Sequence, residues 1–152
     1  MTDVVAPVAG LVRPLSEVPD PVFAAEMVGA GVAIEPSGGL VDALSPVAGT
    51  VVTLRPHAFV VLTADGTGIL VHLGIDTVRL DGAGFALLVE QGSRVAAGQP
   101  VTRWDPADVV ARGLSPMVML CVLDTAAGAV VSGRLGDTVA VGDPLFAWPS
   151  AS

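Results

Sequence analysis

The sequence predicts an all-β protein, an antiparallel β-sandwich of many short strands with one or two short helices. First, 18 glycines and 12 prolines interrupt short apolar runs at close intervals, which is typical of strands joined by tight turns. Second, two kinds of segment occur twice along the chain, which suggests two similar sheets packed face to face. Third, 152 residues suit one domain that buries about two-thirds of its unfolded surface. We therefore expect a single domain over 1–152, with its motifs within 4–148.

The strands are predicted from runs of apolar and β-branched residues that end at glycine, proline or aspartate. They are expected near 8–13, 31–35, 39–44, 48–54, 58–64, 67–73, 76–80, 85–89, 99–103, 117–123, 128–134 and 144–148. One segment carries the signals of a helix instead, because Asp105 suits the N-cap, Pro106 the first helical position and Gly113 the C-terminal break. We expect a helix of about two turns there.

The repeated segments come in two pairs. Residues 5–12 read VAPVAGLV and residues 44–51 read LSPVAGTV, so each copy sets a proline before a small-residue turn that opens a strand. Residues 92–98 and 136–142 both read Gly-x-x-Val-x-x-Gly, like the hairpins of biotinyl and lipoyl carriers. The chain contains no lysine, which excludes attachment of biotin or lipoate, a Schiff base and a P-loop lysine.

Composition excludes several further classes of function. The formal net charge is −8, and the basic residues form no run, so we expect no nucleic-acid binding. The lone cysteine, Cys121, excludes an internal disulfide, and its apolar surroundings indicate a buried small hydrophobe instead of a reactive thiol. No stretch approaches the roughly 20 apolar residues of a membrane span, and no targeting segment is evident. We expect a cytoplasmic monomer without direct membrane insertion.

Both histidines of the chain, His57 and His72, flank one predicted β-hairpin. Asp65-Gly66 between two apolar runs favours a two-residue type I′ turn, because both central residues of that turn need a positive φ. Such a turn would put Phe59 opposite His72. The two imidazoles would then share one face, with Cβ atoms within roughly 8 Å.

The predicted register also assigns the two faces of the hairpin. One face is apolar throughout and is expected to be the core side, with Ala58, Val60, Leu62, Ile69, Val71 and Leu73. On the other face Phe59, Val61 and Leu70 would surround the imidazoles. An exposed apolar patch of this kind marks an interaction site, although solvated surface histidines would fit the same pattern.

Three kinds of chemistry suit this pair of histidines. Zinc hydrolysis would use His57, His72 and Asp76, but the tight spacing of catalytic zinc motifs is absent. A serine hydrolase would need a Gly-x-Ser-x-Gly elbow, which is also absent. Phosphoryl relay needs only a nucleophilic imidazole, donors for the phosphoryl oxygens and a docking surface.

The motifs resemble, in order and spacing, the glucose-type IIA domain of the bacterial phosphoenolpyruvate-dependent sugar phosphotransferase system. The resemblance covers nearly the whole chain. It is most specific in the segment Val-His-Leu-Gly-Ile-Asp-Thr-Val over 71–78. The histidine of this segment, His72, follows the other histidine, His57, by fifteen positions. The other matching segments are 5–10, 20–24, 27–36, 45–49 and 56–58.

The resemblance implies a phosphocarrier that accepts a phosphoryl group from the histidine phosphocarrier protein and passes it to a cysteine of a sugar-transporter IIB domain. It implies that His72 is phosphorylated and that His57 stabilises the phosphoryl group. Asp76, Val78 and Phe23 would lie beside the site, and Phe59 and Leu70 would complete the partner-binding rim. No metal or other cofactor is required, although His57 and His72 could bind zinc at a partner interface.

One departure from the family and two other functions stay open. Many members carry a threonine just before the first histidine, whereas this chain has Arg55-Pro56 there, and Arg55 could lend positive charge near the phosphate. One alternative function is a zinc-dependent cell-wall peptidase that uses His57, His72 and Asp76. The other is a regulatory module that docks on metabolic enzymes or transporters. The sequence does not name the sugar, because a IIA domain does not contact it.

Overall fold

The computed structural model describes residues 2–149. Most of its regular structure is strand, and every strand pairing is antiparallel, so the all-β prediction is confirmed. The strands are β1 (Thr2–Val5), β2 (Gly10–Pro14), β3 (Gly29–Pro36), β4 (Val41–Leu44), β5 (Gly49–Arg55), β6 (Ala58–Leu62), β7 (Gly68–Leu73), β8 (Phe85–Leu87), β9 (Arg94–Val95), β10 (Pro100–Trp104), β11 (Val118–Leu123), β12 (Thr138–Val139) and β13 (Pro144–Trp148). The helices are α1 (Pro21–Ala24) and α2 (Pro106–Ala111), with the 3₁₀ turns η1 (Leu15–Glu17) and η2 (Thr77–Leu80). Residues 1 and 150–152, which the single-domain prediction includes, lie outside the described residues.

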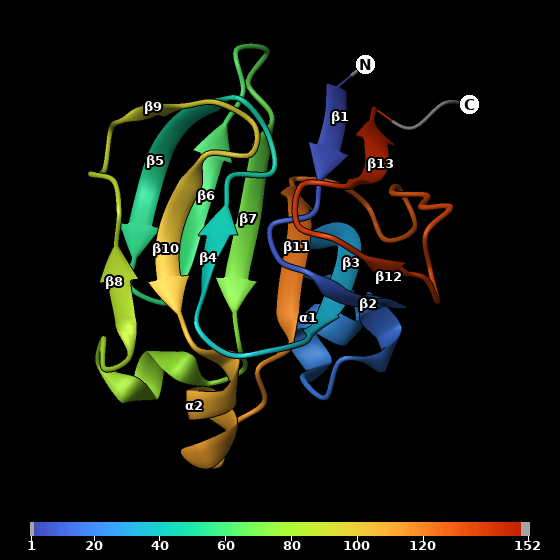
Figure 1. The fold of residues 1–152 in the computed structure, drawn as a ribbon. Coiled ribbons are helices and arrows are strands. Elements are labelled where there is room, and N and C mark those ends of the chain that lie inside the picture. The colour runs from blue at the N-terminus through green and yellow to red at the C-terminus, as the bar shows by residue number, and fades with distance from the viewer. Residues whose placement is uncertain (1, 150–152) are drawn as a thin grey trace.

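One large curled sheet forms the back of the molecule, in the order β12-β2-β3-β11-β7-β6-β5-β9. Two smaller sheets, β1-β13 and β4-β10-β8, lie in front of it (Figure 1). The apolar core fills the space between these layers. Its largest fully buried members include Trp104, Phe59, Ile34, Leu73 and Leu120. The sandwich therefore has an outer face on the large sheet that the core does not use.

The sequence repeats correspond to an internal pseudo-two-fold relation. Strands β1 and β13 pair in the same register as β4 and β10, and the same irregularity interrupts both ladders. The two copies also exchange equivalent hydrogen bonds, because Val5 N donates to the carbonyl of Pro46 (3.0 Å) and Leu44 N donates to that of Pro7 (2.9 Å). The repeat seen in the sequence is therefore also present in the structure. The prediction of two similar sheets is wrong, because the sheets have eight, three and two strands.

Several elements differ from the sequence prediction. The strand predicted over 76–80 is instead the 3₁₀ turn η2, which begins at Thr77. Thr77 Oγ1 donates to the carbonyl of Leu73 (2.7 Å) and turns the chain back. Residues 128–134 contain no strand. The sequence reading also missed β1, β9, β12, η1 and α1. Helix α2 is confirmed, with Asp105 as its N-cap.

Within residues 2–149, no helix has the length and apolar character needed to cross a membrane.

Candidate functional site

The hairpin of β6 and β7 turns through three residues instead of two. Gly66 N donates to the carbonyl of Thr63 (3.0 Å), and Thr63 N donates to that of Thr67 (2.8 Å). Gly66 has a φ of 89°, whereas Asp65 is not among the residues with positive φ. Hydrogen bonds from the Thr63 hydroxyl to Asp65 and from Thr67 N to that hydroxyl stabilise this turn. A loop of this length with glycine last is the second common hairpin type, so the type I′ prediction is wrong.

The different turn shifts the register of the hairpin by one residue. Ala58, and not Phe59, lies opposite His72, which reverses the faces assigned to β6. Phe59 and Val61 are fully buried in the core, while Leu62 is 38% exposed on the outer face. The assignment of Phe59 to an exposed partner-binding rim is therefore wrong. Burial of the phenyl ring gains more apolar contact than burial of Ala58 would.

The faces of β7 follow the prediction. Ile69, Val71 and Leu73 are fully buried, and His72 and Leu70 lie on the outer face. His57 reaches that face by a different route from the one predicted, because it belongs to a two-residue turn between β5 and β6. The His57 carbonyl accepts a hydrogen bond from Leu73 N (2.7 Å), which fixes the turn against β7.

The two imidazoles are in contact. Their ring centroids lie 5.1 Å apart, with the planes at 73°, so the predicted juxtaposition is confirmed. The Phe23 ring of α1 also borders His72, with ring centroids 5.3 Å apart. An aromatic ring from a helix far away in sequence therefore packs beside the two imidazoles.

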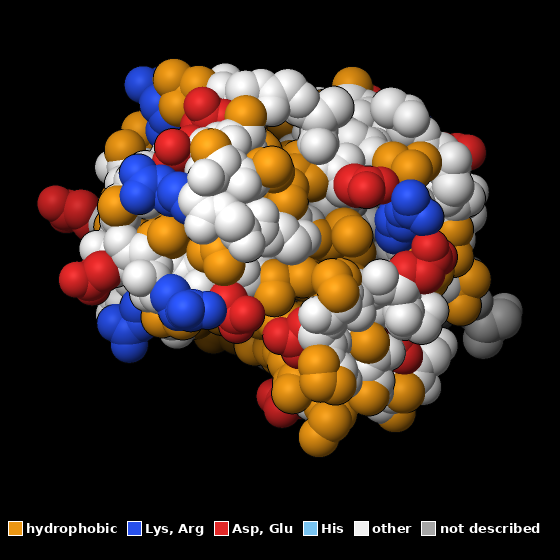
Figure 2. Space-filling view, turned by 90° about the horizontal axis from the view of Figure 1, so that it is seen from below, with side chains coloured by type: hydrophobic (Ala, Val, Ile, Leu, Met, Phe, Trp, Pro, Cys, Tyr) orange, Lys and Arg blue, Asp and Glu red, His pale blue; other side chains and the backbone are white. Residues whose placement is uncertain are grey.

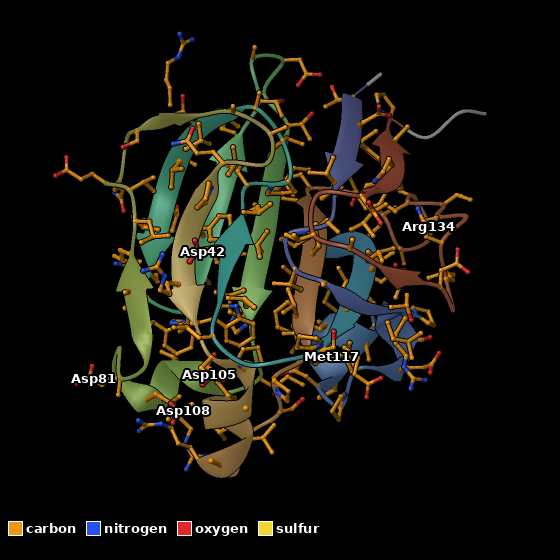
Figure 3. All side chains as sticks on the ribbon, in the orientation of Figure 1. Asp42, Asp81, Asp105, Asp108, Met117 and Arg134 are labelled. Carbon is orange, nitrogen blue, oxygen red and sulfur yellow. The ribbon has the colours of Figure 1, made fainter. Side chains whose placement is uncertain are left out.

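The backbone fixes the tautomer of His72. Its Nδ1 lies 2.7 Å from the carbonyl oxygen of Gly74. Because a carbonyl oxygen only accepts hydrogen bonds, Nδ1 must carry the proton, and Nε2 is left with a free lone pair. Gly74 is held in turn by a hydrogen bond from its N to the carbonyl of Met117 (3.0 Å), just before β11 (Figure 3).

Both histidines are biased toward the neutral form. Burial lowers the pKa of His72, against the opposing effects of the Gly74 carbonyl and the negative charges of Asp20 and Asp76. Burial is also the main cause that lowers the pKa of His57, followed by repulsion from His72 and from Arg55. At neutral pH, His72 therefore presents an uncharged, nucleophilic Nε2.

The other predicted site residues surround this pair unequally. Val78 is 62% exposed on η2, and Asp76 is exposed just before it, with a φ of 60°. Leu70 is half-buried against the apolar cluster beneath η1, so it packs inward more than the prediction assumed. Figure 2 looks onto this end of the molecule, where hydrophobic side chains line a hollow and acidic side chains flank it.

Sequence reasoning missed three contributors to the site. Asp20 caps α1 through hydrogen bonds from Val22 N (2.9 Å) and Phe23 N (3.3 Å), and its charge also acts on His72. Gly74 supplies the carbonyl that orients His72. Thr77, which is buried, closes the turn beyond it. The Asp20-Pro21 pair is the same start signal that predicted α2, so α1 could have been found.

The remaining chemical groups do not form a metal centre or a thiol site. Within residues 2–149, no three side chains of His, Cys, Asp or Glu are grouped to hold a metal ion, so Asp76 does not complete a ligand set with the two histidines. Cys121 is fully buried, and burial raises the pKa of its thiol to about 12. The prediction that Cys121 is a core residue is confirmed.

Comparison with known proteins places this geometry in a family. Residues 2–128 match the sequence model of the phosphoenolpyruvate-dependent sugar phosphotransferase system, EIIA 1. The chain belongs to this EIIA family. The resemblance seen in the sequence is therefore confirmed, and with it a phosphocarrier role in sugar uptake.

Individual relatives agree with this assignment. The glucose-specific EIIA component of Bacillus anthracis is 38% identical over 141 residues, which cover 91% of this chain and 84% of the relative. The N-acetylglucosamine-specific EIICBA component of Escherichia coli is 40% identical over 150 residues, 96% of this chain but 23% of that longer protein. The solved structure of glucose permease IIA from Mycoplasma capricolum superposes with a TM-score of 0.77 at 36% identity, covering 94% of this chain and 92% of its own. This EIIA chain therefore has the IIA β-sandwich fold.

Proposed function

We propose that His72 of this EIIA chain accepts a phosphoryl group from the histidine phosphocarrier protein and passes it to a cysteine of a sugar-transporter IIB domain. One observation carries the proposal. The Gly74 carbonyl holds the proton of His72 on Nδ1, which leaves Nε2 as a neutral nucleophile on an outer face that a partner can reach. The ring of His57 is in direct contact with His72, and within residues 2–149 no group of side chains is arranged to hold a metal ion, which suits group transfer better than hydrolysis.

The transfer follows from this tautomer. The Nε2 lone pair attacks phosphorus in line with the donor's N–P bond, and the electron pair of the broken bond returns to the donor imidazole. Because Nδ1 keeps its proton, the phosphorylated ring carries a positive charge and is a good leaving group. When the thiolate of the IIB cysteine attacks phosphorus, the N–P electrons return to Nε2 and the ring is neutral again.

His57 stabilises the transferred group in this proposal. Its ring contacts that of His72 edge to face, so an N–H of His57 lies close enough to donate to a phosphoryl oxygen on Nε2. A neutral imidazole has one such donor. The Phe23 ring, which packs beside His72, helps to exclude water when a partner docks, and this strengthens the hydrogen bond.

The choice of partners is supported by charge and by the relatives. Asp20 and Asp76 act on His72, and the chain has a formal net charge of −8, so basic partner surfaces are attracted to this face. The names of several relatives combine EIIA with EIIB and EIIC in one protein, which supports a IIB domain as acceptor.

We place the reaction in the cytoplasm, without a resident cofactor. Any zinc bound by His57 and His72 takes the rest of its usual four ligands from the partner or from water.

Incubation with phosphoenolpyruvate, enzyme I and the histidine phosphocarrier protein tests the function. We expect an acid-labile phosphate on His72, visible by ³¹P NMR and absent in His72→Gln. His57→Gln should accept the phosphoryl group but transfer it poorly to the IIB domain. Phosphorylation that persists in His72→Gln would contradict the assignment, and cleavage of peptidoglycan by the metal-loaded protein would favour the peptidase alternative.

A further inference from the structure

His72 lies in the middle of a row of directly opposed residues that crosses the large sheet. Opposed residues on neighbouring strands point to the same face, so the members of this row share the outer face of the sheet. From β2 to β5 the row reads Arg13, Ala33, Met119, His72, Ala58 and Arg55. Each end of the row is therefore an arginine, and one of them is separated from His72 by a single alanine.

The two arginines differ in what they bind. Arg13 forms ion pairs with Glu17 (2.8 Å) and Glu35 (3.1 Å). Arg55 is exposed and forms no ion pair with any residue in 2–149. Its guanidinium keeps all its hydrogen-bond donors available for a ligand.

The distance across Ala58 suits an arginine side chain. Neighbouring strands are about 4.8 Å apart, so the backbones of Arg55 and His72 are separated by about two such spacings. The Ala58 side chain is a single methyl group and does not obstruct the path. The positive charge of Arg55 already acts on His57, the ring that touches His72.

The phosphorylated site has an excess of negative charge that a further cation would offset. A phosphoryl group on His72 adds about two negative charges near neutral pH, and the positive charge of the phosphorylated ring offsets only one of them. Asp20 and Asp76 already act on the same residue. His57 is held toward its neutral form and offers a hydrogen bond without a full charge. A guanidinium, which stays charged and matches phosphate oxygens in pairs, would offset the excess.

We propose that the Arg55 guanidinium reaches across Ala58 and binds the phosphoryl group on His72. The inference rests on the proposed function and names the residue that holds the charge of the transferred group. It makes Arg55 a phosphoryl-binding residue, which stabilises the dianion and slows its loss to water. The ionisation of the phosphoryl group is the property that this contact changes directly.

The test compares Arg55→Gln with Arg94→Gln. Arg94 is a second exposed arginine on the outer face without an ion pair in 2–149, but its row runs through Thr50, Leu62 and Gly68. That row is four residues from the row of His72, which corresponds to roughly 13 Å along a strand. Both substitutions remove one positive charge from the same face, and only one removes it beside His72.

The readout is the pKa of the phosphoryl group, from ³¹P shifts of the phosphorylated protein against pH. We expect Arg55→Gln to raise it by roughly half a unit to one unit, Arg55→Lys to restore part of the shift, and Arg94→Gln to leave it unchanged. The difference should shrink in about 1 M salt, where charges are screened within roughly 3 Å. Equal titrations of wild type and Arg55→Gln, or equal shifts in both Gln variants, would overturn the proposal.

Loading His72 by two routes separates this proposal from the functional one. The histidine phosphocarrier protein is the physiological donor, and phosphoramidate is a small-molecule donor that phosphorylates imidazoles without any protein partner. If phosphoramidate loads the wild type and the carrier protein does not, the proposed function fails, and the titration of Arg55→Gln still decides the role of Arg55. If both load it and the titrations coincide, only the role of Arg55 fails.

Discussion

Gly74 has two structural roles at once, and an amino acid with a side chain would not fit at this position. Its φ is 85°, and a Cβ at this position would lie 2.5 Å from Thr77 Cγ2 and 3.0 Å from the carbonyl oxygen of Ser115. Its own carbonyl accepts a hydrogen bond from the N–H of His72 Nδ1. The backbone geometry that admits only glycine is therefore the geometry that orients the nucleophile.

Gly74→Ala is expected to reduce both stability and phosphorylation. The strained φ and the contact with Thr77 should cost about 1–3 kcal/mol in the free energy of unfolding, measured with urea. Displacement of the carbonyl should also shift the His72 tautomer, which ¹⁵N NMR reports. Gly142→Ala is the matched control, because Gly142 has the same φ of 85° with nothing within 4 Å. An unchanged His72 tautomer in Gly74→Ala would contradict this role of the carbonyl.

Helix α1 is the element that brings Phe23 to His72, and it begins at a single capping side chain. Asp20 accepts hydrogen bonds from Val22 N and Phe23 N at 2.9 and 3.3 Å. Asp105 caps α2 through Ala107 N and Asp108 N at the same two distances. The chain thus contains two equivalent caps, only one of which borders the site.

Asp20→Ala and Asp105→Ala should each lower the free energy of unfolding by about 1 kcal/mol. Only Asp20→Ala should slow phosphoryl transfer, because it releases Phe23 from the edge of His72. Rates of transfer to a IIB domain, alongside denaturant curves, test the difference. Asp20→Asn keeps a capping oxygen but removes the charge, so slow phosphoryl transfer in this variant would assign the effect to the charge of Asp20. Equal transfer rates in all variants would contradict a role for α1.

At the scale of the element, the sequence predicted α2 and most of the long strands, because their signals are local. It failed for the hairpin register, where Asp65-Gly66 fits both a two-residue and a three-residue loop. The choice was made by burial of Phe59 and Val61, and that depends on the opposite layer of the sandwich. The same limit explains why β9 and β12, with two residues each, were missed: they are strands only because a neighbour pairs with them.

The whole molecule places the site at a boundary. Around β3 and β11, the outer face of the large sheet is covered by η1 and α1, over a cluster that includes Leu15, Val18 and Met119. Around β5 and β6 the same face is open, with Val52 40% exposed. The pseudo-two-fold relation of the strands is therefore broken by the covering segment, and His72 lies where the covered and open halves meet.

The two histidines, which are half-buried, couple the stability of the molecule to pH. Their pKa values are lower in the folded protein than in the unfolded chain, so the unfolded chain binds more protons below about pH 6.5. Stability should therefore be full above that pH and should fall as the pH decreases through the unfolded pKa toward the folded one. Urea unfolding from pH 7.5 to 5.5 measures this slope.

His57→Gln/His72→Gln should show a shallower pH dependence than wild type over that range. The comparison cancels the contribution of the carboxylates that the two proteins share. Identical slopes would mean that the imidazoles are equally easy to protonate in both states. In the wild type, phosphorylation should slow over the same fall in pH as Nε2 becomes protonated.

The sequence by itself determined the all-β class, the internal repeat, the helix at Asp105 and the pair of histidines that carries the chemistry. These follow from composition, turn signals and short-range spacing, which act within a few residues. Only the tertiary structure decided which residue lies opposite His72, that Phe59 is buried, and that the carbonyl of Gly74 orients the His72 ring. Such choices depend on how much apolar surface each alternative buries between layers, and that quantity exists only once distant strands have packed together.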